Sequence, residues 1–236
     1  MSRAILFAVI ASAALPLGSA VALWRPPRRR VVAALLAFAS GALITAIAFE
    51  LFEDAFAHGG AWRAAPAFLA GATIFILVDS WLDRRTRSRH AAGASAGFVF
   101  LAGVTLDGLP ENLAMGVGLV ESASATLLIA IFVSNLPEAL VGAQKMKEAG
   151  LGRGRIMLIW SATALVLALA VIVGYGALEG VDKRTLAWPL GFAAGAALAA
   201  LADTLMPEAF EEAREDPNIA YFTALGFLLS FLVSAA

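Results

Sequence analysis

The sequence predicts an all-α polytopic membrane protein, folded as a single transmembrane domain over residues 1–236. Three observations predict this class. Apolar residues make up 61% of the chain and charged residues 15%, against roughly 45–50% and about 25% in soluble domains. The apolar residues fall into blocks of about 20, the helical length that crosses a ~30 Å hydrocarbon layer. The sequence lacks the alternation of apolar and polar residues that a membrane β-barrel needs, so each block is expected to be a helix.

Eight spans are expected, separated by proline, glycine and charged residues. They run over residues 4–24, 31–56, 65–82, 94–120, 123–145, 155–178, 187–209 and 217–235. The first could be a secretory signal, but its apolar run is longer than the roughly 7–15 residues of a signal, and a basic stretch follows it rather than a small-residue cleavage site. We therefore expect a retained helix. The chain has no cysteine, which excludes disulfides and thiolate metal sites.

The distribution of basic residues predicts the orientation. The loops after the first, third, fifth and seventh spans hold 13 of the 17 Lys and Arg residues. Cytoplasmic loops of membrane proteins carry an excess of this kind. Both termini are therefore expected on the non-cytoplasmic side of a cell membrane, either an inner or a plasma membrane.

The second and seventh spans share a sequence pattern. Residues 38–41 and 51–56 read FASG and LFEDAF, and residues 192–195 and 205–210 read FAAG and LMPEAF. The offset is 154 residues at both ends, and the two spans are expected to run in opposite directions. This predicts an inverted repeat, a construction typical of transporters. The alternative is a chance likeness between two helices rich in Ala and Gly.

A second internal likeness relates the fourth span to the fifth. Residues 107–113 (DGLPENL) align with residues 134–140 (SNLPEAL), and the Leu, Pro, Glu and final Leu coincide. Both stretches lie near the middle of their spans. Side chains four residues apart share a helix face, so Asp107 lies on the face of Glu111, and Ser134 on that of Glu138.

Three carboxylates are thus expected near one membrane depth. Each costs at least ~2.5 kcal/mol there, and no span carries a Lys, Arg or His at that depth. If the faces meet, protons or a bound cation must supply the positive charge. Pro110 and Pro137 are expected to kink their helices and free a carbonyl oxygen. Oxygen ligands suit Mn, Fe(II) or Mg, although zinc also accepts carboxylates. The alternative is that the acids are protonated and hydrogen-bonded as structural contacts between helices.

The two stretches resemble the paired His-Asn-x-Pro-Glu-Gly type motifs that ZIP (Zrt/Irt-like) metal transporters carry on the fourth and fifth of eight helices. The span count and the outward termini also match, and residues 202–209 resemble the family's seventh helix. The resemblance implies a 3+2+3 arrangement, in which an inverted repeat of spans 1–3 and 6–8 surrounds spans 4 and 5. The resemblance, to a divergent prokaryotic-type member, covers nearly the whole chain, but only the two Pro-Glu motifs are specific. It implies that the metal is bound by Asp107, Glu111, Ser134, Glu138, Asn135 and Asn112.

The chain departs from the family pattern in several places. Gly108 replaces the Asn that often helps to bind a second metal, whereas Asn135 retains the matching position on the fifth span. Asn112 stands where Gly is usual and adds an amide oxygen. The sixth span has no acid between Arg155 and Tyr175. We therefore expect one oxygen-lined transport site rather than a binuclear centre.

The predicted function is that of a secondary transporter, not an enzyme. It would move a divalent cation (Zn, Mn, Fe(II) or Cd) toward the cytoplasm by alternating access. The metal is the transported substrate, and no organic cofactor is expected. The expected partners are the bilayer and a second copy of the chain in a homodimer, which the resemblance implies. No nucleic acid is expected as a partner. One alternative is a metal sensor or scaffold of the same fold. Another is an intramembrane metal-dependent hydrolase, which usually needs a histidine that no span interior contains.

Acidic clusters are expected at two ends of the molecule. Three acids in residues 50–54 close the second span, and five in residues 208–216 follow the seventh. They are either solvated helix ends or regions that concentrate cations at an entrance and an exit. His58 and His90, at helix ends or in loops, are expected to be solvated.

Overall fold

The computed structural model describes residues 1–91, 96–121, 125–213 and 216–235. Within these ranges, the side chains of residues 83, 85–91, 96–104, 106 and 107 lie outside the description. The described residues form helices joined by short connections, with no strand among them. The elements, in chain order, are α1 (Ser2–Trp24), α2 (Arg29–Ala46), η1 (Ile47–Phe52), α3 (Glu53–Gly59), α4 (Ala61–Ala91), α5 (Ala96–Glu121), α6 (Ala125–Glu148), α7 (Arg153–Leu178), α8 (Lys183–Ala200), η2 (Leu201–Leu205), α9 (Met206–Ala213) and α10 (Ile219–Ser234).

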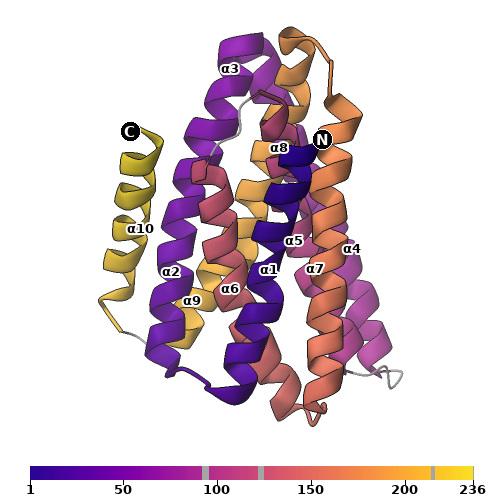
Figure 1. The fold of residues 1–236 in the computed structure, drawn as a ribbon, viewed down its shortest axis with the longest axis vertical. Coiled ribbons are helices and arrows are strands. Elements are labelled where there is room, and N and C mark those ends of the chain that lie inside the picture. Colours follow the sequence, from indigo (N-terminus) through magenta and orange to yellow (C-terminus); the bar gives the residue numbers. More distant parts are fainter. Residues whose placement is uncertain (92–95, 122–124, 214–215, 236) are drawn as a thin grey trace.

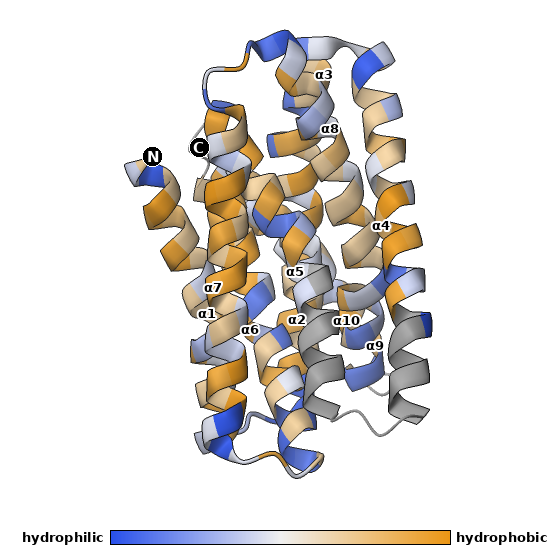
Figure 2. Cartoon of the chain, turned by 90° about the vertical axis from the view of Figure 1, so that its right-hand side faces the viewer, coloured by the Kyte–Doolittle hydropathy of each residue, from blue (hydrophilic) through white to orange (hydrophobic). Residues whose placement is uncertain are grey.

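Each expected span overlaps a helical stretch whose ends lie within about four residues of the prediction, except that α4 continues to Ala91, beyond the expected end at residue 82. Six of these stretches, within the described ranges, are long and apolar enough to cross a membrane: residues 2–24, 29–59, 61–82, 125–148, 153–178 and 183–213. Helix α10 is a shorter apolar helix. Hydrophobic residues follow the helices through the middle of the bundle, and hydrophilic residues gather at its two ends (Figure 2). The described residues thus have the all-helical fold that the composition predicts, and their long apolar helices are consistent with a polytopic membrane protein.

Local sequence explains where several helices begin and end. Helix α6 ends before Gly150, whose φ of +87° is a left-handed conformation that glycine adopts without steric cost. Helix α8 begins after Asp182, whose carboxylate accepts a hydrogen bond from the Thr185 N–H at 3.1 Å. An aspartate in this position satisfies one of the backbone donors that a helix start leaves unpaired.

Two of the long helices contain a stretch of π-helix. Helices α2 and α3 continue one another through η1, and α8 and α9 continue one another through η2. The stretch η1 begins at Ile47 and η2 at Leu201, so the two starts differ by the same 154 residues that relate the sequences. Stretches of π-helix are rare and occur often at functional sites.

The helices pack as two groups. Helices α1, α5, α6 and α7, which we call the motif group, make most of their contacts with one another. The frame group consists of α2–η1–α3, α4, α8–η2–α9 and α10; its closest pairs are α2 with α10 and α4 with α8. The two groups meet mainly where α2 packs against α6 and α5 packs against α8. Figure 1 shows α3 at one end of the bundle and the α1–α2 connection at the other.

Glycines permit the closest contacts inside the frame group. A Cβ at Gly41 of α2 would overlap the Thr223 carbonyl oxygen of α10, and a Cβ at Gly195 of α8 would overlap the Phe68 carbonyl oxygen of α4. Small residues allow helices to approach in this way within membranes. Gly41 and Gly195 again lie 154 residues apart, so both halves of the frame group use the same packing device.

Candidate metal site between α5 and α6

The two Pro-Glu motifs lie inside α5 and α6. Pro110 is within α5 and Pro137 within α6, and neither helix is broken there. The expected kinks stay a prediction. Because both helices continue through their motifs, each motif side chain has a fixed direction relative to its neighbours on the same helix.

The contact that joins the two motifs is between Glu111 and Ser134. Glu111 is 4% exposed and Ser134 is fully buried. The Ser134 hydroxyl donates to Glu111 Oε2 at 3.2 Å, and it lies 3.0 Å from the Ile131 carbonyl oxygen of its own helix. A hydroxyl carries one hydrogen, so these two acceptors share it. The faces of α5 and α6 that carry the two motifs therefore meet at this point.

The structure gives less detail on the other two predicted carboxylates, Glu138 and Asp107. Glu138 is partly buried, one turn after Ser134 on α6. Asp107 belongs to α5, one turn before Glu111, but its side chain lies outside the described residues. Among the residues whose side chains are described, no three His, Asp or Glu groups gather closely enough to hold a metal ion.

Two buried asparagines flank the Glu111–Ser134 contact in the sequence. Asn112 donates from Nδ2 to the Gly108 carbonyl oxygen at 2.8 Å. Asn135 donates from Nδ2 to the carbonyl oxygen of Ala11 at 3.4 Å, so its amide is turned toward α1. The Oδ1 atoms of both are buried and have no hydrogen-bond partner within the described part of the chain. A buried acceptor without a partner costs about 1–3 kcal/mol, and an amide oxygen is a ligand that hard cations accept.

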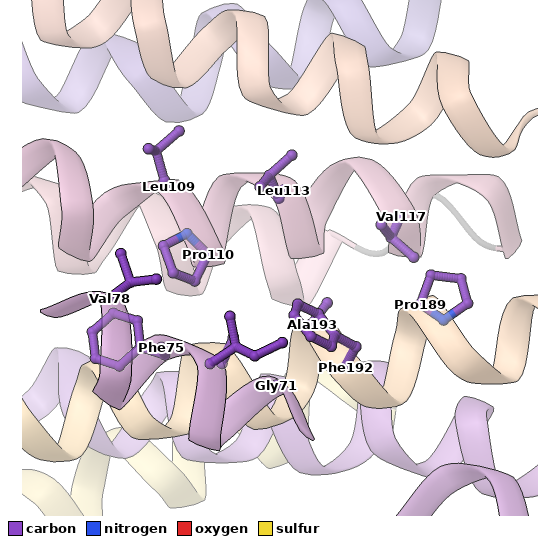
Figure 3. A pocket seen from close by; sticks show the side chains of 12 residues that line it. Gly71, Phe75, Val78, Leu109, Pro110, Leu113, Val117, Pro189, Phe192 and Ala193 are labelled. Carbon is purple, nitrogen blue, oxygen red and sulfur yellow. The ribbon is translucent and has the colours of Figure 1, made fainter. Parts of the chain in front are cut away.

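An apolar cavity of about 300 Å³ lies beside this region, between α4, α5 and α8. Figure 3 shows Leu109, Pro110 and Leu113 of α5 on one side of it and Phe192 of α8 on the other. Its lining residues are all apolar, so it offers no side-chain ligand to a cation. The chemistry of the candidate site therefore resides in the α5–α6 contact rather than in this cavity.

Charged side chains pair at the ends of the bundle, and the sequence analysis did not predict these pairs. His58 is 14% exposed, and its Nε2 lies 3.4 Å from Glu121 Oε1. The expectation that His58 is solvated is thus wrong, because α3 packs against α8 and brings it beside the end of α5. The side chain of His90 lies outside the described residues. Position at a helix end predicted exposure for His58, and the sequence contained no signal of the neighbouring helix.

No protein-family model matches the chain, and no curated protein matches it in sequence.

Proposed function

We propose that this chain is a secondary transporter of divalent metal cations, related in fold to the ZIP family. The observation that carries the proposal is the buried hydrogen bond between Ser134 of α6 and Glu111 of α5, which brings two similar motifs together at mid-helix. A carboxylate buried among apolar helices needs a compensating positive charge or a proton. The unpartnered oxygens of Asn112 and Asn135 add neutral ligands of the kind hard cations accept.

We infer that α5 and α10 also cross the membrane, which gives eight spans in a 3+2+3 arrangement. Helix α5 is 26 residues long, and α10 packs along α2, which is long and apolar enough to span. Three features support an inverted repeat of α1–α4 and α7–α10. The π-helical stretches start 154 residues apart. The same offset relates Gly41 to Gly195. The α2–α10 contact has its counterpart in α8–α4, and the α1–α6 contact in α7–α5.

The proposed orientation places both termini on the non-cytoplasmic side of a cell membrane. The charge asymmetry of the loops supports it. Both termini lie in the half of the bundle that holds α3, and the connections after α1 and α6 lie at the other end (Figure 1). By this assignment α3 is at the outer face and α9 at the inner face.

Transport would proceed by movement of the motif group against the frame group. A cation bound between α5 and α6 offsets the charge of Glu111 and Glu138, so the loaded site can exist in an apolar surrounding. Relative rocking of two helix groups around a midplane site exchanges outer for inner access. The direction toward the cytoplasm and a homodimeric assembly follow from the resemblance to ZIP transporters.

A metal sensor or scaffold of the same fold would bind the cation without moving it. It shares the site and differs only in the mobility of the two groups. An intramembrane metal-dependent hydrolase is less well supported, because neither histidine of the chain lies in the interior of an expected span.

Uptake of Zn²⁺, Mn²⁺, Fe²⁺ and Cd²⁺ into proteoliposomes tests the proposal. We expect the wild-type chain to transport at least one of these cations. The Glu111→Gln and Glu138→Gln variants should fall to the background rate, because each loses the charge that the cation balances. The matched control is Glu148→Gln, at the exposed end of α6, which should transport at the wild-type rate.

Two outcomes separate the alternatives. Metal binding by wild type without uptake would favour the sensor. Wild-type uptake that persists in both Glu111→Gln and Glu138→Gln would refute the proposed site.

A further inference from the structure

Two clusters of charged side chains connect the motif group to the frame group, one at each end of the bundle. At the α3 end, Lys183 Nζ lies 2.5 Å from Glu121 Oε1, and His58 Nε2 lies 3.4 Å from the same oxygen. At the α9 end, Lys145 Nζ lies 2.6 Å from Glu208 Oε1. Glu121 and Lys145 belong to the motif group, and their partners belong to the frame group. Each pair therefore has to break if the motif group and the frame group separate at that end of the bundle.

The helices that carry these charges are the two that carry the candidate metal ligands. Glu121 is ten residues after Glu111 on α5, which is about 15 Å along a helix, and Lys145 is seven residues after Glu138 on α6, about 10 Å. Neither helix is broken in between. A displacement of the carboxylates relative to the frame group is thus transmitted along the same helix to Glu121 or Lys145.

The two ends have opposite charge arrangements. At the α3 end the carboxylate of Glu121 comes from the motif group and the cation of Lys183 from the frame group. At the α9 end the motif group supplies the cation of Lys145 and the frame group the carboxylate. Glu121 is 16% exposed and Glu208 is 25% exposed, so both carboxylates are shielded from solvent more than ordinary surface acids.

We propose that these ion pairs are the two gates of the transport cycle. The pair of Glu121 with Lys183, supported by His58, closes the outer end, and the pair of Lys145 with Glu208 closes the inner end. This inference rests on the proposed alternating access. Both pairs are formed in this structure, which therefore has both ends closed. One pair opens while the other stays formed.

The strength of such pairs suits a gate. Partly exposed ion pairs contribute little to stability, so removing one shifts an open–closed equilibrium by about two- to fivefold. A gate of this strength opens without a large barrier, yet its loss is measurable. The effect should be confined to the end at which the pair was removed.

Labelling of a single introduced cysteine tests the proposal without requiring transport. The natural chain has no cysteine, so Ser134→Cys places a unique thiol at the candidate site. A membrane-impermeant maleimide is applied from either side of oriented proteoliposomes. Added Lys145→Gln should speed labelling from the α9 side about two- to fivefold and leave labelling from the α3 side unchanged or slower. Added Lys183→Gln should do the reverse.

Two further variants guard against misfolding and nonspecific effects. The charge swap Lys145→Glu with Glu208→Lys should restore the parent labelling rate, because the pair re-forms with reversed polarity. Ser234→Ala removes a 2.7 Å hydrogen bond to Glu50 that lies within the frame group, and it should change labelling from neither side. Unchanged labelling in both Lys→Gln variants, or no rescue by the swap, would overturn the proposal.

A disulfide experiment separates failure of the gates from failure of the proposed function. Oxidation of the Lys145→Cys/Glu208→Cys protein should reduce metal uptake to background, and a reducing agent should restore it. The control pair Glu50→Cys/Ser234→Cys joins two elements of the frame group and should transport equally in both redox states. Wild-type uptake together with undiminished uptake by the oxidised gate variant would refute the gates alone. Side-specific labelling without any wild-type uptake would support the gates and refute transport of the metals tested.

Discussion

The two helix groups differ in how many of their buried polar side-chain atoms have a hydrogen-bond partner. In the frame group, the buried hydroxyls of Ser40 and Thr45 donate to backbone carbonyls at 2.9 and 3.0 Å. Among the described residues, the buried side-chain atoms without a partner are mostly in the motif group (Ser12 Oγ, Asn112 Oδ1, Asn135 Oδ1 and Trp160 Nε1), whereas the frame group has His58 Nδ1. Buried polar atoms in native proteins are normally paired, and exceptions call for an explanation. The hydroxyls of Ser40 and Thr45 thus stabilise the packing of the frame group, whereas Asn112 and Asn135 of the motif group retain oxygens that the proposed function explains.

The largest effect on stability is expected from Gly41→Ala in the frame group. The added Cβ would overlap the Thr223 carbonyl oxygen, and α2 and α10 must then move apart. Overpacking of this kind costs about 1–3 kcal/mol, measured as a lower free energy of unfolding in detergent. The control is Gly154→Ala in the first turn of α7, where a Cβ meets no neighbouring atom, and which should be neutral or slightly stabilising. Equal effects at both sites would contradict the packing described for the frame group.

For Asn112→Leu in the motif group, we expect the free energy of unfolding to rise, whereas Gly41→Ala lowers it. This change removes one hydrogen bond to Gly108 and also the buried, unpartnered Oδ1, whose burial costs about 1–3 kcal/mol. We expect the metal-free protein to gain about 1 kcal/mol of stability, while uptake falls at least about tenfold. Thermal unfolding and proteoliposome uptake check the two halves of the prediction. A destabilised variant with wild-type uptake would show that Asn112 is a structural residue.

A polar-to-apolar change in the frame group provides the matched test. Thr45→Val keeps the shape of the side chain but removes the hydrogen bonds from Oγ1 to the carbonyl oxygens of Phe227 and Gly41, at 3.0 and 3.3 Å. The expected loss is about 1 kcal/mol, with uptake unchanged because both hydrogen bonds of Thr45 lie within the frame group. Stabilisation by Thr45→Val would remove the contrast between the two groups.

The smallest effect concerns the helix starts of the two groups. Asp182 caps α8, and the hydrogen bonds from the Thr185 side chain and backbone N–H hold its pKa below the usual range. A lowered pKa stabilises the fold above the unfolded-state value and loses that contribution as the pH falls through the folded-state value. Asp182→Ala should therefore lower Tm slightly at neutral pH, and the difference should begin to shrink as the pH falls below about 4 and disappear below the folded-state pKa. Gly152, at the uncapped start of α7, allows the reverse test, because Gly152→Asp should add a cap. A Tm difference for Asp182→Ala that is independent of pH would contradict this explanation.

The sequence predicted the helices well because each one is bounded by residues with a clear local effect. The basic stretch after Trp24 and the prolines, glycines and charged residues between the apolar blocks mark breaks at which the structure also interrupts the helices. The 154-residue offset was also visible in the sequence, and it reappears in η1 and η2. Local chemistry and repetition are properties of the chain itself, so no tertiary contact is needed to detect them.

The direction of individual side chains at the site was less predictable. The spacing of Ser134 and Glu138 placed them on one face, but it did not show that Ser134 would contact Glu111 or that Asn135 would turn toward Ala11. Those directions depend on how α6 is rotated against α1 and α5, which packing decides. The ion pair of Lys145 with Glu208 joins residues far apart in the sequence, and nothing local marks it.

The most direct test of the central claim is a crystal structure of the protein soaked with Mn²⁺ or Zn²⁺, with the metal located by anomalous scattering. We predict one peak between α5 and α6, within about 2.0–2.3 Å of a Glu111 carboxylate oxygen, and its loss in Glu111→Gln. Anomalous peaks confined to the acidic ends of the bundle, with none between α5 and α6, would contradict the claim.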